Sequence, residues 1–219
     1  MDEAGTGSLV RLWLAREGAL WFGLGARDEA LVATATGKTR EEALRFLLSS
    51  LPHGAPYRLA DEATAFFDST VRTLAALEAG EDVEPRFRLA GEWIDEASAR
   101  VFRLAASIPR GYACSYGRLA AAAGVTAREV GRLMARNPLY PLVPCHRVVG
   151  SDYALVGYRG ATSGPDLDDK LVRLRAEARG YKEERELGGE GGILVFPVER
   201  VLARVEGAPP PLDRQLSLW

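Results

Sequence analysis

The chain has 219 residues, a formal net charge of −2 and an apolar fraction of 47%, which suits one large or two small globular domains. No run of about 18 apolar residues occurs, so no membrane partner is expected. Residues 1–5 lack the basic-then-apolar pattern of a secretory signal. Two cysteines cannot build a disulfide framework or a four-thiolate zinc site, so a reducing, cytoplasmic protein is the simplest expectation.

The charge is unevenly distributed along the chain. Residues 101–160 hold eight arginines and only two acidic residues, a net charge of +6, while the remainder carries about −8. A basic segment inside an acidic protein is typical of a phosphate-facing surface, although it also fits a solvated face.

The first part of the chain predicts a small α+β module. Residues 9–15, 20–24 and 30–36 alternate or run apolar between glycine-containing turns, which indicates an antiparallel meander. Thr39 and Glu42 form a capping box for one helix, and a second helix is expected over residues 61–77. His53 lies in a Pro-His-Gly loop and is expected at the surface. We assign residues 1–88 to this module.

Residues 89–206 predict a second, mostly helical domain, so the fold class is α+β. Asp95 leads one helix, Ser115 caps a short helix that stops at Gly124, and Thr126 with Glu129 caps the next. Two helices joined by a short turn and rich in arginine resemble a helix-turn-helix, while an ordinary helical hairpin with a basic face is the alternative.

The remainder of this domain is expected to alternate turns, strands and helices. A turn and strand are expected over residues 151–160, and a helix over 166–179 with an apolar stripe of Leu167, Leu171, Leu174 and Ala178. A turn-rich stretch over 181–192, a strand over 193–196 and a short helix over 197–205 complete it. Residues 207–219 form a Pro-rich tail.

Cys145 and His146 stand side by side between Pro144 and a Val-Val pair, which predicts a turn feeding a strand. Cysteine and histidine both do nucleophile or base chemistry near neutral pH, because their surroundings shift their pKa values easily. The alternative for an arbitrary pair is a buried cysteine beside a surface histidine.

Six short motifs occur in one order at close spacing: residues 108–111 (IPRG), 115–116 (SY), 128–131 (REVG), 136–138 (RNP), 144–149 (PCHRVV) and 157–160 (GYRG). Together they resemble the C-terminal domain of the methylated-DNA–protein-cysteine methyltransferases, the O6-alkylguanine-DNA alkyltransferases. The resemblance covers residues 95–179, and the module before it fits the variable N-terminal domain of that family.

The resemblance implies direct DNA repair, in which the alkyl group of O6-alkylguanine in duplex DNA moves once to the protein's own cysteine. Cys145 would accept the group, His146 would take the thiol proton through a water, Glu177 would orient His146, and Asn137 would brace the turn before the active-site segment. No metal and no cofactor are implied, and a monomer is expected.

The same resemblance implies how DNA would be held. The base would be flipped out by a helix-turn-helix in the minor groove, with Arg128 filling the vacated position and Tyr116 contacting the flipped nucleotide. Further DNA contacts would come from Arg118, Arg132, Arg136 and Arg147. The guanine pocket would be lined by Tyr116, Val148, Tyr158 and Arg159.

The chain departs from the family at two places. Arg159 and the longer stretch of residues 160–169 replace a small residue and a short Gly-Gly link, which suggests a wider or re-aimed pocket rim with altered tolerance for bulky alkyl groups. The zinc site of some relatives' N-terminal domains cannot form, and Cys114 is expected to be a packed structural residue.

Other readings of the chain remain open. Gln215, Leu216, Leu218 and Trp219 resemble a peptide that docks on sliding clamps, and the alternative is a tail that frays or folds back. A Cys-His hydrolase would use the same pair with repeated turnover. A non-enzymatic alkylated-DNA binder is a third reading, against which the presence of Cys145 argues.

Overall fold

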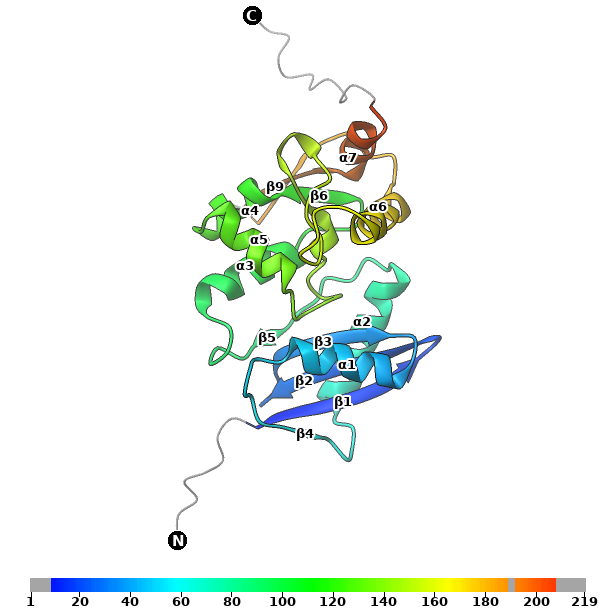
Figure 1. Cartoon of the computed structure of the whole chain (residues 1–219), viewed down its shortest axis with the longest axis vertical. Helices are drawn as coiled ribbons and strands as arrows, with labels where there is room; N and C mark the ends of the chain where they lie inside the picture. Colours follow the sequence, from blue (N-terminus) through cyan, green and yellow to red (C-terminus); the bar gives the residue numbers. More distant parts are fainter. Residues whose placement is uncertain (1–8, 189–191, 208–219) are drawn as a thin grey trace, which may run out of the picture. The chain divides into compact units, whose positions relative to one another are not determined.

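The computed structural model describes residues 9–188 and 192–207, which form two compact units (Figure 1). The first unit contains the described residues up to Ser107 together with Arg136–Pro144, and the second contains Ile108–Ala135 and the described residues from Cys145 onward. The expected change of domain at residue 88 falls inside the first unit. The boundary between an N-terminal module and a DNA-binding domain at residue 88 stays a prediction.

The first unit is built on a five-stranded sheet in the order β4-β1-β2-β3-β5. The predicted meander is confirmed as β1 (Val10–Glu17), β2 (Leu20–Arg27) and β3 (Ala30–Gly37), which pair antiparallel. Two short edge strands pair parallel to it, β4 (Tyr57–Leu59) on β1 and β5 (Arg88–Leu89) on β3. The sequence indicates an extended segment over residues 86–89, which contains β5, but it does not predict β4, because three residues are too few for a periodic pattern.

Three helices accompany this sheet: α1 (Arg40–Ser50), α2 (Ala65–Ala79) and α3 (Glu96–Ala106). The Thr39 hydroxyl accepts from the Glu42 backbone N–H at 3.1 Å, while the Glu42 carboxylate reaches the backbone N–H of Lys38 instead of Thr39. α2 begins at Ala65 behind its Thr64 cap, so the expected start near residue 61 is wrong. Asp95 caps α3 as predicted.

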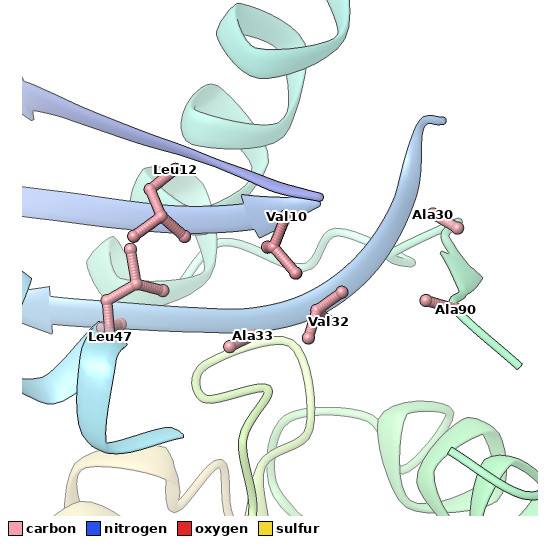
Figure 2. Packing of buried hydrophobic residues seen from close by; sticks show 8 residues of the cluster. Val10, Leu12, Ala30, Val32, Ala33, Leu47 and Ala90 are labelled. Carbon is pink, nitrogen blue, oxygen red and sulfur yellow. The ribbon is translucent and has the colours of Figure 1, made fainter. Parts of the chain in front are cut away.

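The core of the first unit lies where α1 packs on the sheet (Figure 2). Val10 and Leu12 of β1 meet Leu47 of α1 in this cluster, and Val32 and Ala33 of β3 continue it. Gly23 lies under the same helix, where a Cβ atom would come within 3.2 Å of Leu47. A side chain at this position would therefore require Leu47 to shift by a few tenths of an ångström.

The second unit is built on a four-stranded sheet in the order β7-β6-β9-β8. The strands are β6 (Tyr112–Ser115), β7 (Val148–Val149), β8 (Arg185–Leu187) and β9 (Ile193–Pro197). β7 and β9 were predicted, whereas β6 and β8 were not. The strand expected within residues 151–160 is wrong, because a short 3-10 helix, Ser151–Tyr153, occupies its start.

Four helices complete the second unit: α4 (Tyr116–Ala123), α5 (Ala127–Ala135), α6 (Pro165–Glu177) and α7 (Val198–Val205). Ala113 of β6, Phe196 of β9 and Leu174 of α6 share one buried cluster, to which Val198 and Val201 of α7 also belong. No helix in the described part of the chain is long and apolar enough to cross a membrane.

Candidate active site and DNA-binding helices

The helix pair α4–α5 is set by local caps. The Ser115 hydroxyl accepts from the Arg118 backbone N–H at 3.2 Å, and Gly124 ends α4 in the left-handed conformation with φ 70°. At the start of α5, Thr126 and Glu129 form the full reciprocal capping box, with bonds of 2.8 and 3.2 Å. The two helices pack on each other, so the predicted helix-turn-helix is present.

The five predicted DNA-contacting arginines fall into two groups. Arg128 and Arg132 on α5, and Arg136 directly after it, are exposed. Arg118 instead donates to Glu184 at 3.3 Å and lies 5.4 Å from the centre of the Phe196 ring. Arg147 is largely buried and paired with Glu177. The first group is the more exposed of the two, and within it Arg132 lies 3.9 Å from the Glu129 carboxylate.

Cys145 opens the 3-10 helix Cys145–Arg147, whose end feeds β7, as the flanking residues predicted. The cysteine is 6% exposed. Burial raises the pKa of Tyr116 to about 12 and raises that of Tyr158 as well, and a negative charge on the nearby Cys145 sulfur acts in the same direction. Both phenols therefore stay protonated and able to donate.

His146, Glu177 and Arg147 form one buried ion-pair network. The His146 Nε2 atom lies 2.8 Å from a Glu177 carboxylate oxygen, and Arg147 donates two further bonds of 2.9 Å to that carboxylate. Burial alone would raise the pKa of Glu177, but the bonds and charges of His146 and Arg147 outweigh it and lower the pKa to about 2. Glu177 is therefore a carboxylate at neutral pH.

His146 is held in its neutral form. Burial lowers its pKa below 6.5 despite the opposing effect of Glu177, and the positive charges of Arg147 and Arg173 act in the same direction as burial. With Nε2 engaged by Glu177, Nδ1 is a buried ring nitrogen without a hydrogen-bond partner among the described residues. A neutral imidazole with one free nitrogen can accept a proton there.

Lys170 is a site residue that the sequence analysis missed. Its side chain is fully buried, and its ammonium donates to the carbonyls of Val148, Val156 and Gly157 at 2.7 to 2.9 Å. Burial lowers its pKa to about 8, and the nearby Cys145 thiolate opposes that shift. Lys170 thereby ties the strand after the cysteine to the loop that carries Tyr158.

The expected apolar stripe of α6 needs a correction. The buried positions of this helix are Lys170, Leu174 and Glu177, whereas Leu167 and Leu171 are only partly buried. A turn-by-turn pattern of leucines could not reveal this, because the buried charges are stabilised by partners on other elements. The spacing of Lys170 and Glu177, two turns apart on one face, was the available signal.

A cavity of about 520 Å³ is lined in part by Val156 and Gly157, whose carbonyls bind Lys170. Its wall includes Tyr116 of α4, Arg128 and Met134 of α5, and Tyr158 and Arg159 of the loop before α6. The Tyr116 hydroxyl donates to the Gly157 carbonyl at 3.2 Å, while the buried Tyr158 hydroxyl has no partner in the described part of the chain. The predicted pocket residue Val148 is buried, with its carbonyl bound to Lys170.

Asn137 lies in the first unit, in the segment that leads to Pro144. Its side-chain amide donates to the Val143 carbonyl at 2.7 Å and accepts from the Leu139 N–H at 3.0 Å. The same segment is fixed to β3, where Thr34 donates to the carbonyls of Pro138 and Tyr140. Cys114 is buried, with its pKa raised to about 11, chiefly by burial, as fits a packed thiol. Within residues 9–188 and 192–207, no group of side chains fit to hold a metal ion occurs.

The second unit combines a helix-turn-helix with a buried cysteine, and the histidine that follows the cysteine pairs with a buried glutamate. This combination defines a DNA-binding protein with a thiol-centred site. A family model described as 6-O-methylguanine DNA methyltransferase, DNA binding domain, matches residues 96–179. The methylated-DNA–protein-cysteine methyltransferase of Methanosarcina acetivorans is 37% identical over 111 residues, which cover 50% of this chain and 69% of that protein. The chain belongs to the methylated-DNA–protein-cysteine methyltransferase family.

Two further relatives set the extent of the likeness. The Pyrobaculum aerophilum protein of the same name is 48% identical over 79 residues, 36% of this chain and 51% of that protein. A solved variant of the M. tuberculosis O6-methylguanine methyltransferase is 25% identical with a TM-score of 0.51, covering 80% of this chain and 96% of that one. The chain spans about half the length of the first curated relatives it matches.

Proposed function

We propose that this protein repairs duplex DNA by moving the alkyl group of O6-alkylguanine to Sγ of Cys145, once per molecule. The observation that carries the proposal is the buried His146–Glu177–Arg147 network directly beside the cysteine, with Nδ1 of a neutral imidazole unoccupied. A thiolate is the reactive form of cysteine, and a positioned base is what generates it.

The proposed step balances as follows. The Cys145 thiol gives its proton to His146, through a water in the manner of the family, and Glu177 stabilises the resulting imidazolium. The thiolate then attacks the alkyl carbon, so that an S–C bond forms as the C–O6 bond breaks. The electron pair of that bond stays on guanine, which takes up a proton. The thioether carries no acidic proton and is a poor leaving group, so the protein is consumed.

The substrate base must leave the helix before attack, because O6 lies within the base pair. The cavity lined by Tyr116, Arg128 and Tyr158 would supply a place for it, and both tyrosines lie close enough to Cys145 for a charge on its sulfur to act on them. We propose that Arg128, exposed in the first turn of α5, fills the vacated position, while the protonated Tyr116 hydroxyl exchanges its bond to the Gly157 carbonyl for one to the flipped base. The helix-turn-helix would lie in the minor groove.

The decisive experiment measures the mass of cysteine peptides after incubation with duplex DNA that contains O6-methylguanine. We expect the Cys145 peptide to gain one methyl group, with one transfer per protein molecule. Cys114→Ala is the matched control and should transfer fully, because the buried Cys114 thiol has its pKa raised to about 11 and stays protonated. Full transfer by Cys145→Ala would refute the proposal.

The same experiment separates the alternatives. A Cys-His hydrolase would release product repeatedly from ester or peptide substrates, and a non-enzymatic binder would hold the lesion DNA without any mass change. A single stoichiometric shift on Cys145 excludes both.

The DNA-binding surface has its own test in the salt dependence of binding. Each phosphate contact contributes a slope of about −0.9 to the plot of log affinity against log salt. We expect Arg132→Ala to reduce the slope by about one contact, because its side chain is 71% exposed and its pair with Glu129 is long at 3.9 Å. Arg118→Ala should change the slope little, because Arg118 is only 37% exposed and donates to the more buried Glu184 at 3.3 Å. Equal effects of both variants would contradict the proposed surface.

The sliding-clamp partner stays a prediction. Gln215, Leu216, Leu218 and Trp219 lie outside the described residues. An immobilised clamp should retain the full chain better than a version ending at Gly207, and equal retention would dismiss this partner. Sedimentation of the full chain tests the expected monomer.

A further inference from the structure

The loop before α6 makes a tight two-residue turn with an arginine at its tip. Tyr158 and Ala161 bond to each other through both backbone pairs, at 2.9 and 2.8 Å, with Arg159 and Gly160 between them. Both tip residues are left-handed, with φ of 48° and 84°. Turns of this kind favour Asn-Gly, because a larger side chain is strained in the left-handed region. An arginine at this tip therefore needs contacts that hold it there.

Three contacts hold Arg159. Its guanidinium lies 3.3 Å from the Asp169 carboxylate and 3.8 Å from that of Asp166, both in the first turns of α6. It also lies 4.9 Å from the centre of the Tyr158 ring. Asp169 is itself fixed, because Arg173 donates to it at 3.1 Å from one turn further along the helix. We name this set, Arg159 with Asp166 and Asp169, the rim latch.

The same turn forms part of the cavity wall. Tyr158, Arg159, Gly160 and Ala161 all line the cavity, opposite residues of α4 and α5 such as Tyr116 and Met134. Lys170 of α6 holds the base of this wall through the carbonyls of Val156 and Gly157, and the rim latch is the ion-pair contact that holds the tip of the turn to the same helix. A latched wall fixes the width of the cavity at this side.

We propose that the rim latch is a specificity-determining device that limits the size of the O6 substituent the pocket accepts. With the latch closed the wall is fixed and a methyl group fits, whereas a bulky group such as benzyl requires the turn to move away from α6. This inference rests on the proposed alkyl transfer. The two carboxylates also argue against Arg159 as a phosphate ligand, because its charge is already matched.

The test compares transfer rates for duplexes carrying O6-benzylguanine and O6-methylguanine, each followed by the mass of the Cys145 peptide. Arg159→Asn is the main variant, because asparagine suits the left-handed tip and deletes only the latch. Asp169→Asn opens the latch from the helix side, and the double variant removes both halves. Arg175→Gln is the matched control. Arg175 lies on the same helix as Asp169 and makes a similarly exposed ion pair with Glu206, which follows α7.

We expect both single variants to raise the benzyl-to-methyl rate ratio by about tenfold, which is the scale of discrimination by pocket size. The double variant should raise it no further than either single one, because all three remove the same latch. The control should leave the ratio unchanged. The latch is half-exposed, so in the wild type the ratio should also rise between about 0.05 and about 0.5 M salt, and in Arg159→Asn it should not.

A ratio that stays within about twofold of the wild type in both single variants would overturn the rim latch. Additive increases in the double variant would overturn it as well, since two independent effects would then be at work. Failure of the proposed function gives a different result: neither substrate then adds mass to Cys145 in the wild type. Melting curves of each variant by circular dichroism establish that it is folded.

Discussion

Replacing Glu177 by glutamine removes the one negative charge of a buried network while keeping the shape of the side chain. Glu177 accepts from His146 and twice from Arg147, and all three side chains are at most 12% exposed. A glutamine offers one oxygen and turns an N–H₂ group toward the Arg147 donors. The variant therefore leaves a buried guanidinium without its counter-ion.

The size of the effect follows from the shifted pKa. The carboxyl has its pKa lowered from 4.5 to about 2 in the folded protein. A shift of this size corresponds to about 3 kcal/mol of stability at pH 7, at roughly 1.4 kcal/mol per unit. Breaking a buried ion pair from one side costs about 3 to 5 kcal/mol in general, so the two estimates agree in scale.

The sign of the pH dependence is fixed by the direction of the shift. Because the folded-state pKa lies below the unfolded one, the contribution of Glu177 is present above pH 4.5 and is lost as the pH falls toward 2. At pH 3 about 1 kcal/mol of the contribution should remain. The stability gap between the wild type and Glu177→Gln should therefore narrow by about 2 kcal/mol between pH 7 and pH 3.

Urea unfolding followed by far-ultraviolet circular dichroism measures this gap. Tryptophan fluorescence is unsuitable, because Trp13, Trp21 and Trp93, the tryptophans of the described chain, all lie in the first unit. Glu206→Gln is the control: its pair with Arg175 is exposed, so it should change stability by less than about 1 kcal/mol. A gap below about 1 kcal/mol at pH 7, or one that is as large at pH 3, would refute the reasoning.

Three further substitutions test other parts of the structure. Lys170→Met leaves three buried carbonyls without their donor, so it should cost about 2 kcal/mol or more in urea unfolding and slow alkyl transfer to Cys145. Asn137→Ala removes both bonds that brace the segment before Pro144 and should cost about 2 kcal/mol, measured by tryptophan fluorescence of the first unit. Tyr158→Phe removes a buried hydroxyl without a partner and should leave thermal stability unchanged or raise it by up to about 1 kcal/mol, so a loss of 2 kcal/mol would contradict the structure.

The parts of the fold that could be predicted are those encoded by neighbouring residues. Caps at Thr39, Asp95, Ser115 and Thr126 were found because a cap needs only a side chain and a backbone N–H three residues away. The β1–β3 meander was found because its alternation runs over whole strands between turns. β4, β6 and β8 were missed because their pairing partners are not adjacent in the local pattern and their own length is three or four residues.

The site divides in the same way. Cys145, His146 and Tyr158 were found through their motifs, and Glu177 through the family's spacing on α6. Lys170 was assigned no role, because a lysine inside a helix is ordinarily a solvated residue. Its role comes from its bonds to three carbonyl oxygens on two other segments, and no local sequence pattern predicts these bonds. The burial of charged side chains on α6 likewise depends on partners that lie on other elements of the fold.

The net charge of residues 101–160 likewise could not be interpreted from the sequence alone. Residues 101–160 carry a net charge of +6, yet three of their arginines are matched by carboxylates that lie later in the chain. Arg147 pairs with Glu177, Arg118 with Glu184 and Arg159 with Asp169, and Arg103 pairs with Glu96 just before the segment, so these four pairings leave a net charge of +2. Arg128, Arg132 and Arg136 are the exposed arginines in and just after α5. The sequence charge therefore overstates the unmatched positive charge of this segment, and we expect the salt slope of DNA binding to follow the smaller number.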